Sequence, residues 1–278
     1  MPKLIVTHFN PDLDAVCAVW LLREFDQQFK NAQVVFVPAG ETYQGQKVDS
    51  SPDVVHVDTG LGQFDHHQLK EKTCAAQLVF NYLKSKKKHL KDEKALVQLI
   101  EVVCEVDHFG ECLWPEPTSF RYDFFLSEVL KGLKLSGQAE DQGIVDLGSQ
   151  YLTGVYHCIK VKLKAIEELK EGYPFASKWG EAIGFLTQNS AVIKLAQKKG
   201  YVLVVQKDPE TEHVRIKARP DSAIDLTAAK ERLKNLDPQA TWFLHISKKM
   251  LLNGSTKNDK MKPSKLSLKK VIEVLSVS

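Results

Sequence analysis

Residues 3–16 read KLIVTHFNPDLDAV, and this stretch decides the fold. Its apolar start predicts a short β-strand, which ends in a polar loop carrying His8, Asp12 and Asp14. These polar side chains come directly after the strand, so they lie at its carboxyl end. In open α/β sheets, ligands bind beyond the carboxyl ends of the strands. The opening residues therefore predict both a fold class and the edge of the sheet that carries function.

The next segments extend this pattern. Residues 15–29 have the apolar spacing of a helix, while 33–37 and 54–57 predict two further strands, the second followed by Asp58. Strand, helix and strand within so short a stretch are typical of a parallel sheet with crossover helices. We therefore expect an α/β fold.

The rest of the chain predicts a second, smaller α/β domain. We expect a domain of residues 1–178 that ends in a helical linker, and another of residues 179–278. Helices are predicted at 74–105 (interrupted by a basic run), 119–133, 146–169, 180–199, 223–233 and 266–275, and strands at 201–206, 213–218 and 242–246.

Composition restricts the classes of protein. The chain has 278 residues, a formal net charge of +3, and 33 Lys against only 5 Arg. Such a small net charge does not by itself indicate nucleic-acid binding. No apolar run reaches the roughly 18 residues of a membrane span, so we expect no membrane association and a cytoplasmic location. Five cysteines without paired spacing predict free thiols in a reducing compartment.

Histidines and aspartates at the predicted strand ends suggest a metal site. The set comprises His8, Asp12, Asp14, Asp58, Asp65, His66, His67 and Asp107. Mixed imidazole and carboxylate ligands suit Mn²⁺, Mg²⁺, Co²⁺ or Zn²⁺. Because carboxylates outnumber imidazoles, two ions fit better than one. The alternative for single residues is local: Asp14 could cap a helix and Asp12 could form a turn.

Four segments carry a resemblance to a known family. THFNPDLDAV, VHVDTG, FDHHQ and EVDHFG resemble, in order, the metal-binding motifs of the DHH phosphoesterase superfamily. The resemblance implies a doubly wound α/β domain with a two-metal site, followed by a smaller substrate-binding domain. It also implies hydrolysis of a phosphoester. Manganese is the expected metal, as in the family II pyrophosphatases of the superfamily.

The resemblance also implies roles for individual residues. Six would bind metal: His8 and Asp12 the first ion, Asp14, His66 and Asp107 the second, and Asp58 both. Asp58 and His67 would be catalytic, with His67 facing the phosphate, and Asp65 would fix the orientation of a ligand imidazole. His108, beside Asp107, is a further candidate for contact with the substrate.

The second and third motifs are separated by a short stretch of chain. Only seven positions separate Asp58 from Asp65, which resembles the 3′–5′ RNA exonuclease branch of Myg type. Other members have more chain here, so a strand and helix of the usual pattern are in doubt. Asn10-Pro11-Asp12 is closer to the general superfamily form, which makes the chain a divergent member.

The C-terminal half resembles the DHH-associated domain more weakly. By position, its substrate-binding residues would be Arg219, His245, Asn253, Gly254 and Ser255. The glycine-rich loop of that domain is missing, so its substrate cannot be inferred from relatives. The alternatives are an ion pair of Arg219 with Asp221 or Asp225, and a plain turn at Asn253-Gly254.

These observations predict a two-metal phosphoesterase that acts on a nucleotide or a short single-stranded nucleic acid. Two alternatives stay open: a manganese-dependent pyrophosphatase, and a non-catalytic scaffold on the same fold that binds a phosphate ligand or nucleic acid. A homodimer is also left open.

Overall fold

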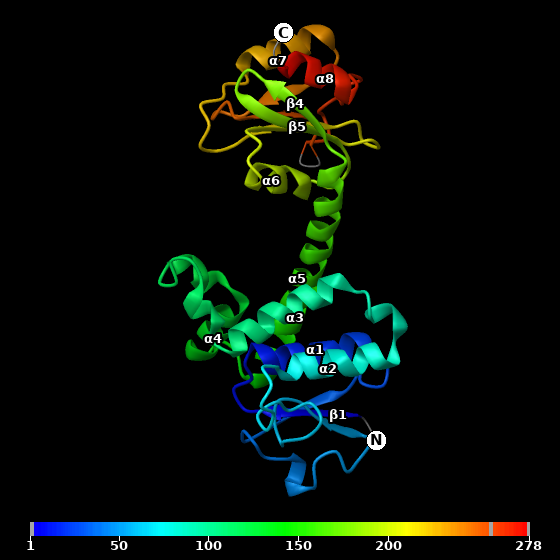
Figure 1. Cartoon of the computed structure of the whole chain (residues 1–278), viewed down its shortest axis with the longest axis vertical. Helices are drawn as coiled ribbons and strands as arrows, with labels where there is room; N and C mark the ends of the chain where they lie inside the picture. The colour runs from blue at the N-terminus through cyan, green and yellow to red at the C-terminus, as the bar shows by residue number, and fades with distance from the viewer. Residues whose placement is uncertain (1–2, 256–257, 277–278) are drawn as a thin grey trace. The chain divides into compact units, whose positions relative to one another are not determined.

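A computed structural model describes residues 3–255 and 258–276. The chain divides into two compact units, one up to Lys160 and one from Val161 onward. Helix α5 (Asp141–Lys170) runs from the first unit into the second (Figure 1). This division lies within α5, earlier in the chain than the boundary expected at 178/179, and thus leaves the last turns of α5 in the second unit.

The first unit contains a parallel sheet of three strands. Strands β1 (Leu4–His8), β2 (Gln33–Val37) and β3 (Val54–His56) lie in the order β2-β1-β3. β1 is paired in parallel with both neighbours. All three strands therefore end at the same edge, which brings His8 and the residues after β3 together, as the sequence pattern predicts.

Helices cover this sheet and form the main core of the unit. They are α1 (Leu13–Phe25), α2 (Ala75–Lys86), α3 (Lys94–Asp107) and α4 (Leu126–Leu135), with 3₁₀ turns at Lys88–Leu90, Gly110–Leu113 and Phe120–Phe124. α1 is apolar on nearly all sides because it packs against β1, α2 and α3. Nine of its residues are buried, among them the charged Asp14.

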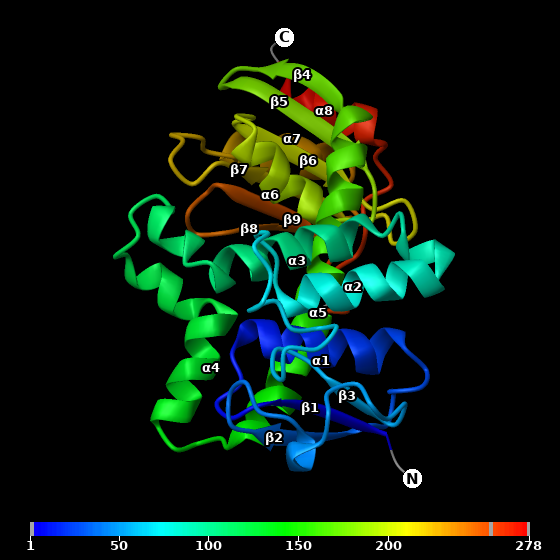
Figure 2. The same ribbon diagram turned by 60° about the horizontal axis from the view of Figure 1, so that its bottom comes forward.

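The winding of the sheet agrees with the expected fold class. Because the strand order reverses at β1, the two crossovers pass over opposite faces of the sheet. Helix α1 lies on one face, whereas the connection from β2 to β3 carries only the 3₁₀ turn η1 (Tyr43–Gly45) on the other (Figure 2). The α/β class is confirmed. The chain between Asp58 and Asp65 contains no further strand or helix, as its length predicts.

The second unit contains a mixed sheet of six strands in the order β4-β5-β6-β7-β9-β8, in which only β5 and β6 are parallel. The strands are β4 (Tyr173–Ser177), β5 (Gly180–Leu186), β6 (Leu203–Lys207), β7 (Val214–Ala218), β8 (Trp242–Leu244) and β9 (Met250–Asn253). Helix α6 (Ala191–Lys198) packs on one face, and α7 (Thr227–Leu236) and α8 (Leu268–Leu275) pack on the other (Figure 1).

The predicted helix at 180–199 is wrong in its first half, which forms β5. Residues 182–185 are all buried because helices cover both faces of the sheet. A strand buried on both sides is a continuous apolar run, which periodicity alone does not separate from a helix. β4 and β9 have no counterpart among the predicted strands. None of the helices within the described residues combines the length and apolar character that a bilayer crossing needs.

Candidate metal centre

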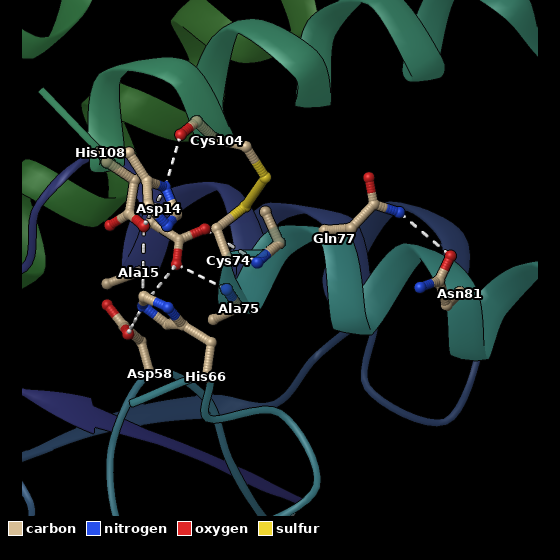
Figure 3. The surroundings of a disulfide bond; sticks show 12 residues. Asp14, Ala15, Asp58, His66, Cys74, Ala75, Gln77, Asn81, Cys104 and His108 are labelled. Carbon is tan, nitrogen blue, oxygen red and sulfur yellow. Dashed lines mark hydrogen bonds and ion pairs between the residues drawn. A yellow bond between two sulfur atoms is a disulfide. The ribbon is translucent and has the colours of Figure 1, made fainter. Parts of the chain in front are cut away.

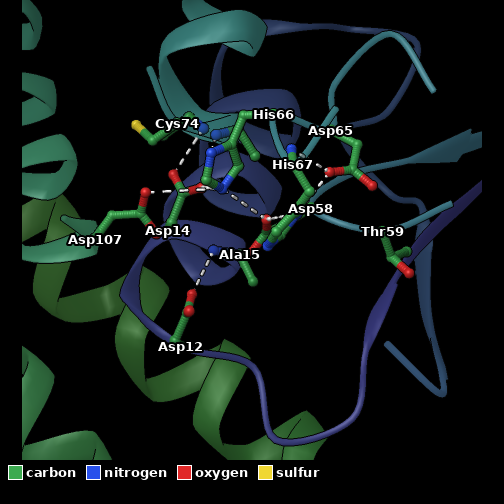
Figure 4. Close-up of polar contacts among 12 residues, drawn as sticks. Asp12, Asp14, Ala15, Asp58, Thr59, Asp65, His66, His67, Cys74 and Asp107 are labelled. Atoms are coloured by element: carbon green, nitrogen blue, oxygen red, sulfur yellow. Dashed lines mark hydrogen bonds and ion pairs between the residues drawn. The ribbon is translucent and has the colours of Figure 1, made fainter. Parts of the chain in front are cut away.

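The six proposed metal ligands converge at the strand-end edge of the first unit (Figure 4). They come from three stretches that are distant in sequence, residues 8–14, 58–66 and 107. β1 contributes His8, the start of α1 contributes Asp12 and Asp14, the loop after β3 contributes Asp58 and His66, and the last residue of α3 is Asp107.

Asp58 lies at the centre of the cluster. Its Oδ2 is 3.2 Å from His8 Nε2, and its Oδ1 is 3.4 Å from His66 Nε2. The side chain is only 3% exposed, and the backbone has a left-handed φ of 54°. A hydrogen bond from the Asp58 nitrogen to the Phe64 carbonyl, 2.9 Å, closes the tight loop that holds this conformation. The two oxygens of Asp58 thus face two different histidines.

Asp14 is fixed by helix α2. Its Oδ2 accepts a hydrogen bond from Ala75 N at 2.6 Å, and its Oδ1 accepts one from Ala76 N at 2.8 Å. These are free N–H groups of the first turn of a helix, which favour an anion. Asp14 Oδ2 also lies 3.8 Å from His66 Nε2. The carboxylate is therefore held in place at the cluster although its side chain is buried.

The donor atoms form three groups, each with ligand atoms within 4.8 Å of one another. The groups are His8, Asp12 and Asp58; Asp14, His66 and Asp107; and Asp58, His66 and His67. The first two correspond to the two sets that the sequence resemblance implies. The third adds His67 as a possible ligand beside its expected role toward phosphate.

Two buried oxygens in the cluster fit a metal ion. Asp58 Oδ1 and Asp107 Oδ2 have no hydrogen-bond partner among the described residues. Asp107 Oδ2 lies 3.7 Å from His66 Nε2, too far for a hydrogen bond. Buried carboxylate oxygens normally have partners, and a divalent cation between these groups would satisfy both. The donor set therefore fits a hard or borderline divalent ion.

Charges within the cluster shift the pKa of its members. Burial lowers the pKa of His8, but the contacts to Asp58 and the Phe9 carbonyl outweigh burial and raise it to about 9. The close contact with the Asp58 carboxylate raises the pKa of His66 to about 9. Burial raises the pKa of Asp14 well above its usual value, and the charge of Asp58 adds to this effect. Without metal, the carboxylates are thus partly neutralised by two protonated histidines.

Ring tautomers leave the Nε2 atoms available to ligands. His8 Nδ1 donates to the Phe9 carbonyl at 2.8 Å, and His67 Nδ1 donates to Asp65 Oδ1 at 2.7 Å. Asp65 is itself fixed by the Leu61 nitrogen, 2.8 Å from its Oδ2. Asp65 therefore orients His67, whose side chain is 60% exposed. This carboxylate–imidazole pairing is typical of histidines that bind a metal or a substrate.

The cluster opens into a pocket of about 420 Å³, called the metal pocket here. Its charged lining consists of His8, Asp12, Asp58, Asp65, His67 and Asp107, and its small or apolar lining consists of Ala39, Gly40 and Leu61. A pocket of this size can admit a phosphate group together with part of a larger molecule.

His108 and a disulfide lie behind the cluster (Figure 3). His108 Nδ1 donates to the Cys104 carbonyl at 2.8 Å and lies 3.3 Å from Asp107 Oδ2. Cys104 is bonded to Cys74, the residue that precedes α2. The expectation of five free thiols is therefore wrong for this pair, because packing of α2 against α3 brings together cysteines 30 positions apart.

Arg219 and His245 in the second unit have local partners. Arg219 Nε and Nη2 both contact the Asp221 carboxylate, at 3.0 and 2.5 Å, which matches the ion-pair alternative. His245 Nδ1 lies 2.8 Å from the Ser247 hydroxyl. Both residues lie at the surface of this unit.

Asn253 and Gly254 shape the chain at the end of β9. Asn253 is fully buried, and its amide group contacts the backbones of Thr241, Lys262 and Ser264. Its amide is used by the protein itself, so we leave Asn253 out of the proposed substrate contacts. Gly254 has φ +83°, and a Cβ there would overlap the His213 ring. Ser255 forms an isolated bridge with Asn258, next to residues 256–257, which lie outside the described chain.

Sequence reasoning missed the backbone donors and the disulfide. The N–H groups of Ala75 and Ala76 carry no side-chain signal, although the sequence predicts a helix from residue 74. The disulfide has no signal in its spacing. Its location, just before one helix and near the end of the next, could have suggested it.

No protein-family model matches the chain, and no curated protein sequence matches it. Among solved structures, it is similar to a DHH-domain protein described as a member of a family of ribosomal proteins. That match has 12% identity and a TM-score of 0.34, and covers 98% of this chain and 85% of the other.

The chain is also similar to RecJ from Thermus thermophilus in complex with Mg²⁺, with 14% identity, a TM-score of 0.30 and 92% of this chain covered. The corresponding Mn²⁺ complex gives 13% identity and a TM-score of 0.31. The chain spans about half the length of these RecJ chains, 47% and 50%.

Proposed function

We propose that this chain is a divergent DHH-type phosphoesterase that hydrolyses a phosphate ester with the help of two divalent ions. The observation that carries the proposal is the position of Asp58 between two ligand groups. One ligand group contains Asp58 together with His8 and Asp12, and one Asp58 oxygen is close to His8. The other Asp58 oxygen is close to His66, which belongs to the second group. A shared carboxylate between two ligand groups is the arrangement that two-metal sites require.

The residues for each ion follow from these groups. His8, Asp12 and Asp58 would hold one ion, and Asp14, His66, Asp107 and Asp58 the other. When bound, the ions supply Lewis acidity and a nucleophile derived from water at neutral pH. Manganese is the proposed metal because imidazole and carboxylate donors are mixed.

The protein's own groups position the phosphate. Asp65 holds His67 so that its Nε2 is the nitrogen available in the metal pocket. When His67 is protonated, this N–H can donate to a phosphate oxygen and stabilise the charge that develops there. We further propose that the second unit, through Arg219 and His245, contributes to binding of a nucleotide or a short single strand.

A screen of metal binding and hydrolysis tests the proposal. The full chain is titrated with Mn²⁺ by calorimetry and then incubated with short oligonucleotides, cyclic dinucleotides, nucleotides and pyrophosphate. We expect two Mn²⁺ per chain and turnover of at least one nucleotide ester. Two ions without turnover of any ester would favour the non-catalytic scaffold, and turnover of pyrophosphate alone would favour a pyrophosphatase.

Two variants compare the loss of a carboxylate in the candidate metal site with the loss of one elsewhere on the surface. Asp58→Ala removes the shared ligand and should abolish both Mn²⁺ binding at two sites and hydrolysis. Asp123→Asn changes an exposed carboxylate of the 3₁₀ turn at Phe120–Phe124 and should leave both unchanged. Equal behaviour of the two variants would contradict the assignment.

A further inference from the structure

A second pocket of about 420 Å³ lies on the other side of the metal-ligand carboxylates. We call it the α4 pocket because α4 forms one of its walls. Asp12 and Asp107 line both this pocket and the metal pocket. A molecule whose phosphate is at the cluster therefore has a second space available for the rest of its structure.

The α4 pocket has an apolar part within a lining that also carries many polar and charged side chains. Leu130 and Ile144 are buried in its wall, whereas Phe109 and Leu135 are 75% and 80% exposed. Large apolar groups so exposed around a concave site are typical of ligand pockets. Figure 2 shows the segment between α3 and α4 looping out beyond the end of α3.

Phe109 is held in an unfavourable backbone conformation. Its φ is 55° and its ψ is 26°, a left-handed conformation that is uncommon for a bulky residue. Hydrogen bonds from Phe109 N to the Val106 carbonyl and from Cys112 N to the Phe109 carbonyl fix it between α3 and the next turn. Strain that gives no burial to the ring points to a function for the exposed ring.

The pocket also has polar groups of complementary kinds. Glu111 lines it, and Glu111 Oε2 is buried without a hydrogen-bond partner in the described part of the chain. Lys131 and Lys134 stand on its α4 wall, paired with Glu128 and Asp141. The pocket therefore combines an exposed aromatic ring with charged groups of both signs.

We propose that the α4 pocket binds the nucleoside part of the substrate. The base stacks on Phe109, and the ester phosphate lies toward Asp12 and Asp107. This inference rests on the proposed function and narrows its substrate class to nucleoside phosphates. Inorganic pyrophosphate has no group for this pocket.

The test uses nucleosides without phosphate, so that binding is measured on the metal-free full chain. Guanosine, adenosine and uridine are titrated by calorimetry, with ribose as the reference. We expect saturable binding of at least one purine nucleoside and none of ribose. Phe109→Ala should weaken the nucleoside affinity about fivefold or more, because the variant loses the stacking of the base on an aromatic ring.

Two further variants complete the test. Phe124→Ala removes a ring that is 85% exposed in the same segment but does not line the pocket, and it should leave the affinity unchanged. Glu111→Gln changes a wall residue whose unpartnered oxygen is buried, and it should likewise leave the nucleoside affinity unchanged. Absence of saturable nucleoside binding, or equal losses in Phe109→Ala and Phe124→Ala, would overturn the proposal.

The two proposals fail in different ways. If nucleosides bind through Phe109 but no ester is hydrolysed with Mn²⁺, the proposed function fails and the pocket assignment stands. If esters are hydrolysed but nucleosides do not bind, the pocket assignment fails and the proposed function stands.

Discussion

Asp14 Oδ2 and the backbone nitrogen of Ala75 lie 2.6 Å apart, so a candidate metal ligand is hydrogen-bonded to the first turn of α2. Ala76 N binds the other oxygen of the same carboxylate. The side chain therefore has two functions at once: it anchors α2 and faces His66. Either function alone would explain a buried aspartate in α1, and together they fix its position within the cluster.

Asp14→Ala should destabilise the metal-free protein as well as abolish binding of the second ion. Two buried N–H groups lose their acceptor, at about 1–3 kcal/mol each. We expect the free energy of unfolding to fall by about 2–6 kcal/mol in urea denaturation. Asp14→Asn keeps one acceptor oxygen, so its free energy of unfolding should fall by less. A metal-free Asp14→Ala protein as stable as wild type would show that the helix does not depend on this carboxylate.

Asp58→Asn should shift the titration of the two histidines. The contacts of Asp58 raise the pKa of both His8 and His66 to about 9. Without the charge, both pKa values should fall toward 6.5, the ordinary value for histidine. Histidine proton resonances followed by NMR between about pH 5 and 11 measure this shift. Asn tolerates the left-handed backbone, so the fold should persist. Unchanged titration in Asp58→Asn would contradict the geometry.

Binding of Mn²⁺ should strengthen as the pH rises from about 6.5 to 8.5. His8 and His66 are protonated in the metal-free protein below about pH 9 and must lose their protons to bind an ion. Each proton lost gives about a tenfold rise in affinity per pH unit. Calorimetry at three pH values across this range measures the slope. A flat profile would show that neither histidine is a ligand.

The stability of the metal-free protein should change in the opposite direction. Because both pKa values are raised on folding, the protonated histidines stabilise the fold fully below about pH 6.5. This stabilisation is lost as the pH rises through about 9. Urea denaturation at the same three pH values checks the sign, and Asp58→Asn should show a weaker dependence.

Opening the Cys74–Cys104 disulfide should lower both stability and metal affinity. In the chain-entropy description, a loop of this length is worth roughly 3–4 kcal/mol. The double variant Cys74→Ser/Cys104→Ser should lose about that much free energy of unfolding. It should also bind Mn²⁺ more weakly, because Cys104 contacts His108 and lies near Asp107. The control is Cys112→Ser, which removes an exposed free thiol.

Thiol counting checks the same bond chemically. The unreduced, denatured protein should react with a thiol reagent at three cysteines, namely Cys17, Cys112 and Cys158. After reduction the count should rise to all five cysteines of the chain. Full reactivity before reduction would show that the pair is open in the protein as prepared.

The first unit was largely predictable because its signals are local. A short apolar strand followed by a polar loop, repeated at β1 and β3, predicts both a parallel sheet and the edge where His8 and Asp58 meet. The local alternative assigned the cap of α1 to the wrong aspartate: Asp12, not Asp14, precedes the helix and accepts a hydrogen bond from Ala15 N at 3.0 Å. The DHH-type motifs contributed the grouping of the ligands around Asp58.

The features missed are those that depend on distant contacts. β5 is apolar on both faces because α6 and α8 cover the sheet, and nothing within residues 180–186 shows those helices. The disulfide depends on the packing of α2 against α3. The exposed ring of Phe109 and the buried oxygen of Glu111 become a pocket only when α4 is in place.

The left-handed backbone of Asp58 has an evolutionary consequence. Among residues with side chains, Asp and Asn adopt this conformation most readily. A change of Asp58 to Asn therefore removes the central charge without disturbing the turn that carries it. One substitution would separate a chain with the proposed activity from a relative that keeps the fold and both pockets but lacks that activity. In any set of relatives, the residue at this position is thus the first to examine when active and inactive branches are sorted.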